Sequence, residues 1–159
     1  MSIRRQSLHF SAVAVTVLAA AALTGCGTLA PSTAPEPDAH LVTFSTQLRA
    51  GNEVPPNASQ ASGIVNALYD KNTGLLRWKV SFTGLSGPAI AAHFHGPAAI
   101  GANAGVALAW LQPISSPMEG RATLTPTQAA DLLAGRWYAN IHTAAHPGGE
   151  VRGQMTLRD

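Results

Sequence analysis

The chain has 159 residues, the length of one domain of ordinary size, and charged side chains are few. Ten basic residues stand against eight acidic ones. Two of the basic residues, Arg4 and Arg5, lie in the leader described next, so the remainder of the chain is formally neutral. That balance leaves no basic field or stripe, and we expect no nucleic-acid partner. The abundance of Ala, Gly and Pro favours short strands and turns.

Residues 1–25 have the features of an export signal. Arg4 and Arg5 precede an apolar run at residues 10–23, which is shorter than the roughly 20 residues that span a bilayer. A positive start, a short apolar core and small residues after it are typical of a secretory signal peptide. The paired arginines also suggest twin-arginine export, although the residues that follow match that pattern poorly.

The end of this leader, Leu23-Thr24-Gly25-Cys26, resembles a bacterial lipobox, whose cysteine is acylated and becomes the new N-terminus. The alternatives are an ordinary signal peptide with an incidental cysteine, and an uncleaved anchor. The small residues and the presence of only one cysteine favour lipidation of Cys26, and more than one acyl chain makes membrane anchoring stable. We therefore expect a bacterial cell-envelope lipoprotein. Because Gly27 rather than Asp follows the cysteine, the outer membrane is the expected location in a Gram-negative cell.

Residues 26–39 contain Pro31, Pro35 and Pro37 among Ser, Thr and Ala, without apolar periodicity. Such a composition is typical of a flexible tether. The folded domain is then expected at residues 40–159. It has no cysteine, so its stability must come from its core alone, or from a core and a bound metal.

Alternating or short apolar runs, separated by turn residues, predict a series of strands. They lie at residues 42–49, 63–69, 76–82, 89–95, 106–111, 120–124, 137–142 and 150–157. One short helix is expected at about 126–134, because Thr125 and Gln128 have the spacing of a capping box and Gly135 follows as a stop. We expect Leu132 and Leu133 to face the core. The prediction is an all-β Greek-key sandwich or barrel of about 7–9 short strands with one helix.

Two histidines distinguish the strand at 89–95. Side chains two apart on a strand share a face, so His93 and His95 are expected on the solvent side and Phe94 in the core.

A third histidine, His142, falls on the outward face of the strand at 137–142 together with Tyr138 and Asn140. Imidazole suits copper and zinc, and several nitrogens in a tetragonal arrangement suit Cu(II). If the two strands are neighbours, they form a metal site on the outside of the barrel. The candidate ligands are His93, His95 and His142, with His146 as a candidate fourth.

The alternative for these histidines is structural. His93 would then bond to the backbone of the turn at 96–97, and His142 to Asn140 or Glu150. A shared ion, with metal–nitrogen bonds of roughly 2.0–2.1 Å, is excluded if the ring nitrogens cannot approach within about 4 Å of each other.

Arg152 lies in the run Gly148-Gly149-Glu150-Val151-Arg152-Gly153-Gln154. It is either a residue that attracts an anion to a nearby metal, or the partner of an ion pair with Glu150 or Glu53. The ion pair is the favoured interpretation. Glu53 itself lies in a stretch, residues 53–56, that is interpreted as a rigid loop.

Several stretches resemble the CHRD domain, the repeat unit of chordin that also occurs in bacterial secreted proteins. They are LRAGNEVPP (48–56), SG (62–63), LSGP (85–88), AHFHGPA (92–98) and YANIHTAAHPGGEVRGQ (138–154). The match runs in the family's order from about Val42 to Leu157. It implies an immunoglobulin-like or superoxide-dismutase-like β fold with a poorly defined molecular role. In chordin the domain belongs to an antagonist of extracellular signalling, a role that does not carry over to a bacterial lipoprotein.

A fainter resemblance is to Cu,Zn superoxide dismutase, which has His-x-His on one strand, a late copper-binding His and an Arg beside the copper. The matching residues are His93, His95, His142 and Arg152. Residues 96–105 contain no His or Asp, so the zinc loop and its bridging His are missing, as is the family's disulfide. Any such site would hold copper alone.

Other catalytic motifs are absent from the sequence: there is no nucleophile elbow, phosphate loop or dinucleotide-binding motif. We therefore expect a non-enzymatic binding or scaffolding lipoprotein, with a candidate copper site and an unidentified envelope or extracellular partner. The alternatives are a copper-only, superoxide-dismutase-like enzyme and a periplasmic metal chaperone or buffer.

Overall fold

The computed structural model describes residues 38–158, in which nine strands form a single antiparallel sheet. The elements in chain order are β1 (Leu41–Arg49), the 3-10 turn η1 (Ala50–Asn52), β2 (Ser62–Asp70), β3 (Leu75–Thr83), β4 (Ala89–His95), β5 (Val106–Ala109), β6 (Met118–Thr123), α1 (Pro126–Leu133), β7 (Tyr138–Thr143), β8 (Val151–Gln154) and β9 (Thr156–Leu157). The predicted signal peptide, the predicted lipidation site Cys26 and most of the predicted tether lie outside the described residues.

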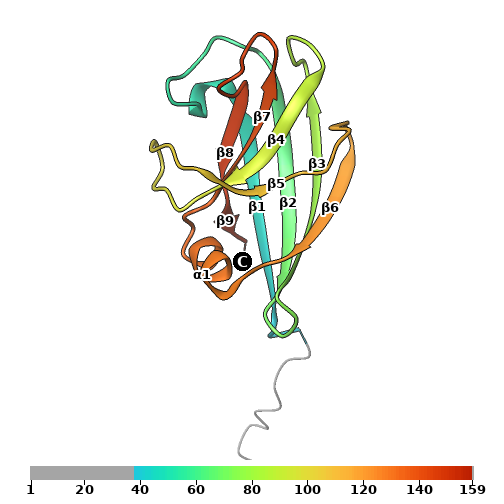
Figure 1. The fold of residues 1–159 in the computed structure, drawn as a ribbon, viewed down its shortest axis with the longest axis vertical. Coiled ribbons are helices and arrows are strands. Elements are labelled where there is room, and N and C mark those ends of the chain that lie inside the picture. Colours follow the sequence, from blue (N-terminus) through green and yellow to red (C-terminus); the bar gives the residue numbers. More distant parts are fainter. Residues whose placement is uncertain (1–37, 159) are drawn as a thin grey trace, which may run out of the picture. The chain divides into compact units, whose positions relative to one another are not determined.

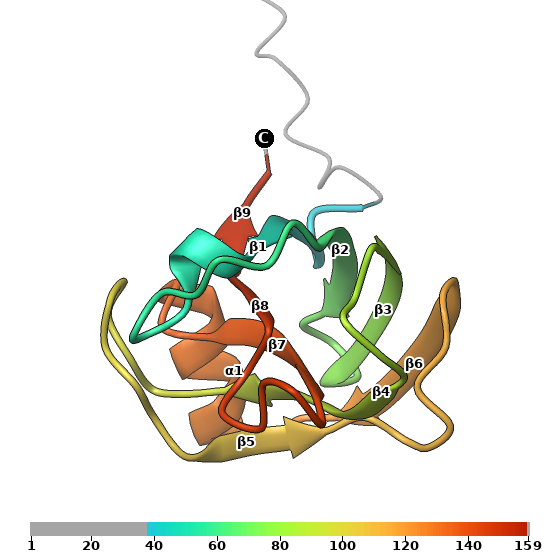
Figure 2. The same cartoon turned by 90° about the horizontal axis from the view of Figure 1, so that it is seen from above.

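The strand order is β5-β4-β7-β8-β1-β2-β3-β6, and β9 pairs with β1. The sheet curls around one core into a half-barrel, with α1 near one end (Figure 1, Figure 2). The predicted all-β class with one short helix is confirmed, and the observed form is a single curled sheet. None of the helices in residues 38–158 has both the length and the apolar character needed to cross a bilayer.

β1 and β3 follow the predicted alternation. In β3, Leu76, Trp78 and Val80 are buried, whereas Arg77 and Lys79 are exposed. The last predicted strand is interrupted at Met155: β8 lies between β7 and β1, and β9 continues the pairing with β1. Periodicity alone does not reveal such an interruption.

Phe94 is packed among three tryptophans in the core. Its ring centroid lies 5.3 Å from that of Trp78, 5.1 Å from Trp110 and 5.8 Å from Trp137. Aromatic pairs at these separations pack favourably beyond their buried area. Because Phe94 is held in this way, the rotation of β4 about its own axis is fixed, and the two histidines that flank Phe94 face away from the core.

Helix α1 forms as predicted, with one correction at its end. Thr125 accepts a hydrogen bond from the Gln128 backbone N–H, and the Gln128 side chain accepts one from the Thr125 N–H, which completes the capping box. Gly135 follows with φ of 69°, a value that favours glycine. Leu132 is fully buried, but Leu133 is 36% exposed, so the expectation that both leucines face the core was wrong.

Candidate metal centre

The three predicted histidines are brought together by the pairing of β4 with β7. His93 lies directly opposite Asn140, and His95 lies opposite Tyr138. His142 is two residues beyond Asn140 on the same face, so it is the diagonal neighbour of His93. Diagonal neighbours on an antiparallel pair are within reach of aromatic side chains, and the sheet therefore collects all three imidazoles on its outer face.

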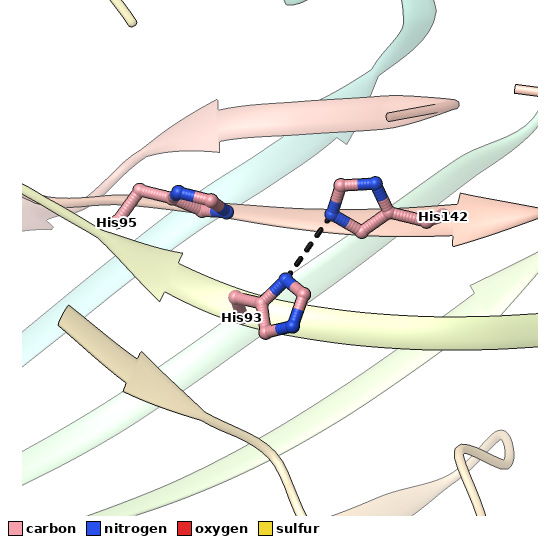
Figure 3. A group of neighbouring side chains, drawn as sticks. All are labelled: His93, His95 and His142. Carbon is pink, nitrogen blue, oxygen red and sulfur yellow. Dashed lines mark hydrogen bonds between the residues drawn. The ribbon is translucent and has the colours of Figure 1, made fainter. Parts of the chain in front are cut away.

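The imidazoles lie close to the separation at which they could share an ion. His93 Nδ1 lies 3.2 Å from His142 Nε2 (Figure 3), and one ligating nitrogen from each of the three residues lies within 4.8 Å of the others. Two bonds of roughly 2.1 Å hold nitrogens at most about 4.2 Å apart. A pair that is 4.8 Å apart must therefore close by at least about 0.6 Å before both nitrogens can bind one ion.

Two of the rings are oriented by backbone carbonyls. His95 Nδ1 is 3.0 Å from the Ala104 carbonyl oxygen, and His142 Nδ1 is 3.0 Å from that of Pro147. Since a carbonyl oxygen only accepts, each Nδ1 carries the hydrogen and each Nε2 keeps its lone pair. Metal-binding histidines are typically fixed through the other ring nitrogen in this way. His95 Nε2 is buried and has no hydrogen-bond partner.

The outward face is not the solvent-exposed surface that alternation predicted. His95 and His142 are each only 8% exposed, and His93 is half-buried. Two loops, residues 96–105 and 144–150, fold back over this face and deliver the carbonyls described above. The first loop is closed by a hydrogen bond from the Gly96 N–H to the Gly105 carbonyl, at 3.2 Å. The prediction that the three histidines lie on the outer face of the sheet is correct, but the prediction that this face is exposed to solvent was wrong.

Burial also controls the charge of the rings. Desolvation lowers the pKa of His93 below its usual value, and the neighbouring His142 and His95 lower it further. Desolvation likewise lowers the pKa of His142, although the bond to Pro147 opposes the shift. Both rings are therefore neutral at pH 7, which is the form that binds metal ions.

His146, the candidate fourth ligand, lies outside the group. Among the described residues, the only set of three mutually close His, Cys, Asp or Glu side chains is His93, His95 and His142. His146 contributes its backbone to a turn instead, exchanging hydrogen bonds with Thr143.

Arg152 is held on the far side of Tyr138 from His95. The Tyr138 ring stacks on that of His95, with centroids 4.8 Å apart and planes within 4°, and the Arg152 guanidinium carbon lies 3.4 Å from the Tyr138 centroid. β4, which carries His95, and β8, which carries Arg152, flank β7. Tyr138 on β7 therefore lies between His95 and Arg152. Arg152 also donates to Asn103 Oδ1 at 2.8 Å and to the Ala102 carbonyl at 2.6 Å.

The expected ion pair of Arg152 is not formed within the described residues. Glu150 accepts hydrogen bonds instead, from Ser59 Oγ, Ser86 Oγ, Thr143 Oγ1 and the Ser86 N–H, at 2.6–2.8 Å. Burial alone would raise the pKa of Glu150, but these bonds outweigh it and lower the pKa to about 2.

Several residues of the site were not among the predicted ones. Alternation placed Tyr138 on the histidine face, but nothing in the sequence indicated that its ring stacks on that of His95. The carbonyls of Ala104 and Pro147 carry no sequence signal at all, since any residue could supply them. One of the two structural partners expected for His142 is present, because Asn140 Oδ1 lies 2.9 Å from His142 Nε2. His93 contacts His142 and not the expected backbone of the 96–97 turn.

The comparisons with known proteins agree with the resemblance seen in the sequence. The family model described as CHRD domain matches residues 44–155, which includes every strand that carries a candidate ligand. Neither the curated proteins nor the solved structures that were searched contain a match. The chain belongs to the CHRD domain family.

Proposed function

We propose that this CHRD domain binds one transition-metal ion, copper by preference, through His93, His95 and His142. In this proposal the protein is a non-enzymatic binding or scaffolding lipoprotein, anchored in the cell envelope through lipid on Cys26.

The observation that carries the proposal is the convergence of three imidazoles, two of which are already oriented by backbone carbonyls. Two Nδ1–H groups are tied to carbonyls, and one freed nitrogen, His95 Nε2, is buried without a partner. Leaving a buried polar atom unpaired costs roughly 1–3 kcal/mol. Binding to a metal ion would remove that cost.

Copper is favoured by the donor set. Affinities of nitrogen sites for divalent ions peak at Cu(II), and imidazole suits copper and zinc. A carrier of Cu(I) would use thiolate or thioether ligands, whereas the described residues contain no cysteine, Met155 is fully buried in the core, and Met118 packs against the core. These features support a site for divalent ions over a Cu(I) chaperone.

The non-enzymatic role is supported by the position of Arg152. Its guanidinium stacks on Tyr138 and donates to Asn103 and Ala102, and Tyr138 separates it from His95. The charge that would draw an anion to the metal is therefore already engaged elsewhere.

Metal titration of the detergent-purified full chain tests the proposal. Competition with a chromophoric chelator should show one equivalent of Cu(II) or Zn(II) bound per chain. His93→Ala and His142→Ala should each weaken binding by at least about 100-fold, and His146→Ala, the matched control outside the group, should leave it unchanged. Circular dichroism verifies folding of each variant. Absence of binding by the wild-type protein, or full binding by His93→Ala, contradicts the proposal.

Superoxide dismutation by the copper-loaded chain, above the level of free copper, contradicts the non-enzymatic role.

The anchor is tested separately. Cys26→Ser should move the protein from the membrane fraction to the soluble fraction when expressed with lipoprotein processing intact, because the acyl chains supply the membrane affinity. Membrane association that persists in the variant contradicts lipid anchoring through Cys26.

A further inference from the structure

Asn140 occupies the middle of the histidine face. It lies opposite His93 of β4 on one side and opposite Arg152 of β8 on the other. The residue is 3% exposed. A buried amide must find partners, and the one partner that its side-chain oxygen contacts is a candidate metal ligand.

The contact joins two lone pairs. Asn140 Oδ1 lies 2.9 Å from His142 Nε2, and His142 Nδ1 carries the ring hydrogen because it faces the Pro147 carbonyl. Nε2 of the neutral ring is therefore an acceptor, as is the amide oxygen. Two acceptors at this distance repel each other unless a cation lies between them, or a hydrogen donated to Nε2 by His93 Nδ1, 3.2 Å away, offsets the repulsion. Rotation of the amide by 180° would make Asn140 a donor to Nε2, and this is the alternative that the experiment must separate.

The distances match the edges of a coordination polyhedron. With metal–nitrogen bonds of about 2.05 Å, the 3.2 Å separation between His93 Nδ1 and His142 Nε2 corresponds to an angle of about 103° at the ion. With a metal–oxygen bond of about 2.2 Å, the 2.9 Å separation between His142 Nε2 and Asn140 Oδ1 corresponds to about 86°. Both angles are normal for a four- or five-coordinate divalent ion.

We propose that Asn140 Oδ1 is the fourth protein ligand, completing a site of three imidazole nitrogens and one amide oxygen. The inference rests on the proposed function, because it needs an ion at the histidines. A neutral oxygen donor is harder than imidazole and favours divalent copper or zinc over Cu(I). The fourth ligand therefore comes from the same strand as His142 and not from the loop that carries His146.

The experiment measures the affinity of the full chain in detergent for Zn(II) and Cu(II). It compares two variants that are expected to change this affinity in opposite directions. Asn140→Leu removes the oxygen and should weaken Zn(II) binding by about 10- to 100-fold. Asn140→Asp supplies an anionic oxygen in the same place and should strengthen it by about 10-fold or more. Asn66→Leu, an exposed amide on β2, is the matched control and should not change affinity.

The alternative predicts the reverse signs. If the amide only donates to His142 Nε2, a metal ion must displace it, so Asn140→Leu would bind Zn(II) as well as the wild type or better. Asn140→Asp would draw a proton onto His142 and bind more weakly. Either result overturns the inference, and the Asp variant, nearly identical in shape, decides the question should the Leu variant fail to fold. If the wild-type chain binds no metal, the proposed function fails instead, so the two failures are distinguishable.

Discussion

At the scale of single residues, His95 and His142 show how much of a binding site is invisible in a sequence. Their positions and their common face follow from two-residue alternation. The nitrogen that each one offers does not, because it depends on which carbonyl reaches the other nitrogen. Ala104 and Pro147 supply those carbonyls through folded-back loops, and a backbone oxygen has no residue-type signature.

Glu53 is a second residue whose environment could not be predicted. The sequence indicated a rigid loop around it, but the structure buries the carboxyl group against Gly149, whose φ of 128° and lack of a Cβ make room for it. Glu53 Oε1 has no hydrogen-bond partner. Desolvation raises the pKa of Glu53 to about 7, although the nearby Arg152 opposes the shift.

Glu53→Gln should therefore stabilise the protein at alkaline pH. A raised folded-state pKa means that the stability contributed by Glu53 is complete below about pH 4.5 and is lost as the pH rises through about 7. The variant should gain about 1–2 kcal/mol over the wild type at pH 8, since water in the adjacent 500 Å³ cavity screens part of the charge. Urea unfolding at pH 5 and pH 8 measures the difference. An advantage for the variant that does not grow between these two pH values would show that the buried carboxyl is not responsible.

At the scale of elements, β4 and the loop that follows it were predictable to different degrees. The alternation of β4 was correct, because Phe94 packs among tryptophans whose large apolar surface dominates the energy. Its pairing with β7 could not be derived, since any two outward-facing strands satisfy the same pattern. The path of residues 96–105 depends on close packing at Gly96, which composition alone does not specify.

Gly96→Ala should weaken both the fold and metal binding. A Cβ at Gly96 would lie 2.5 Å from Trp137 Cδ1 and 2.8 Å from the Arg136 carbonyl oxygen, so the loop must shift and the Ala104 carbonyl with it. We expect a loss of about 1–3 kcal/mol in the free energy of unfolding, with weaker Zn(II) binding. Chemical denaturation and chelator competition measure the two effects.

Gly105 provides the control from the other end of the same loop. A Cβ there meets nothing within 4 Å, so Gly105→Ala should match the wild type in both measurements. Equal behaviour of the two variants would mean that the loop does not depend on the contact at Gly96.

At the scale of the whole molecule, Glu150 joins the end of β7 to two loops that are far from it in the sequence. Its carboxylate, fully buried, accepts hydrogen bonds from Ser59, Ser86 and Thr143. Charge-assisted hydrogen bonds of this kind are the stronger ones. Residues 144–150, the loop between Thr143 and Glu150, also supply the Pro147 carbonyl, so this network connects global stability to the orientation of His142.

Glu150→Gln should cost about 2–4 kcal/mol in the free energy of unfolding, because an amide cannot accept all four bonds. The pKa of about 2 means that the contribution is present above pH 4.5 and is lost as the pH falls toward 2. The wild type should therefore lose its advantage over the variant in acid, as followed by urea unfolding. Glu119→Gln, an exposed carboxylate paired with Lys79, should change stability little. A constant difference between wild type and Glu150→Gln from pH 7 to pH 3 would contradict this account.

The all-β class of the fold could be predicted from the sequence, but the order of the strands in the sheet could not. Turn residues and alternation identified the strands and the capped helix, and with them the all-β fold. The order β5-β4-β7-β8-β1-β2-β3-β6 depends on contacts between distant segments. It is this order that brings His93 and His95 to His142, and places Arg152 behind Tyr138 rather than beside Glu150.

The most direct test of the account is a long-range ¹H–¹⁵N correlation spectrum of the imidazoles in the full chain, before and after one equivalent of Zn(II). We expect the metal to shift the nitrogen resonances of His95 Nε2, His142 Nε2 and His93 Nδ1, while the Nδ1–H groups of His95 and His142 are retained. Unchanged resonances for these three rings, or shifts confined to His40 and His146, would contradict a metal centre built from β4 and β7.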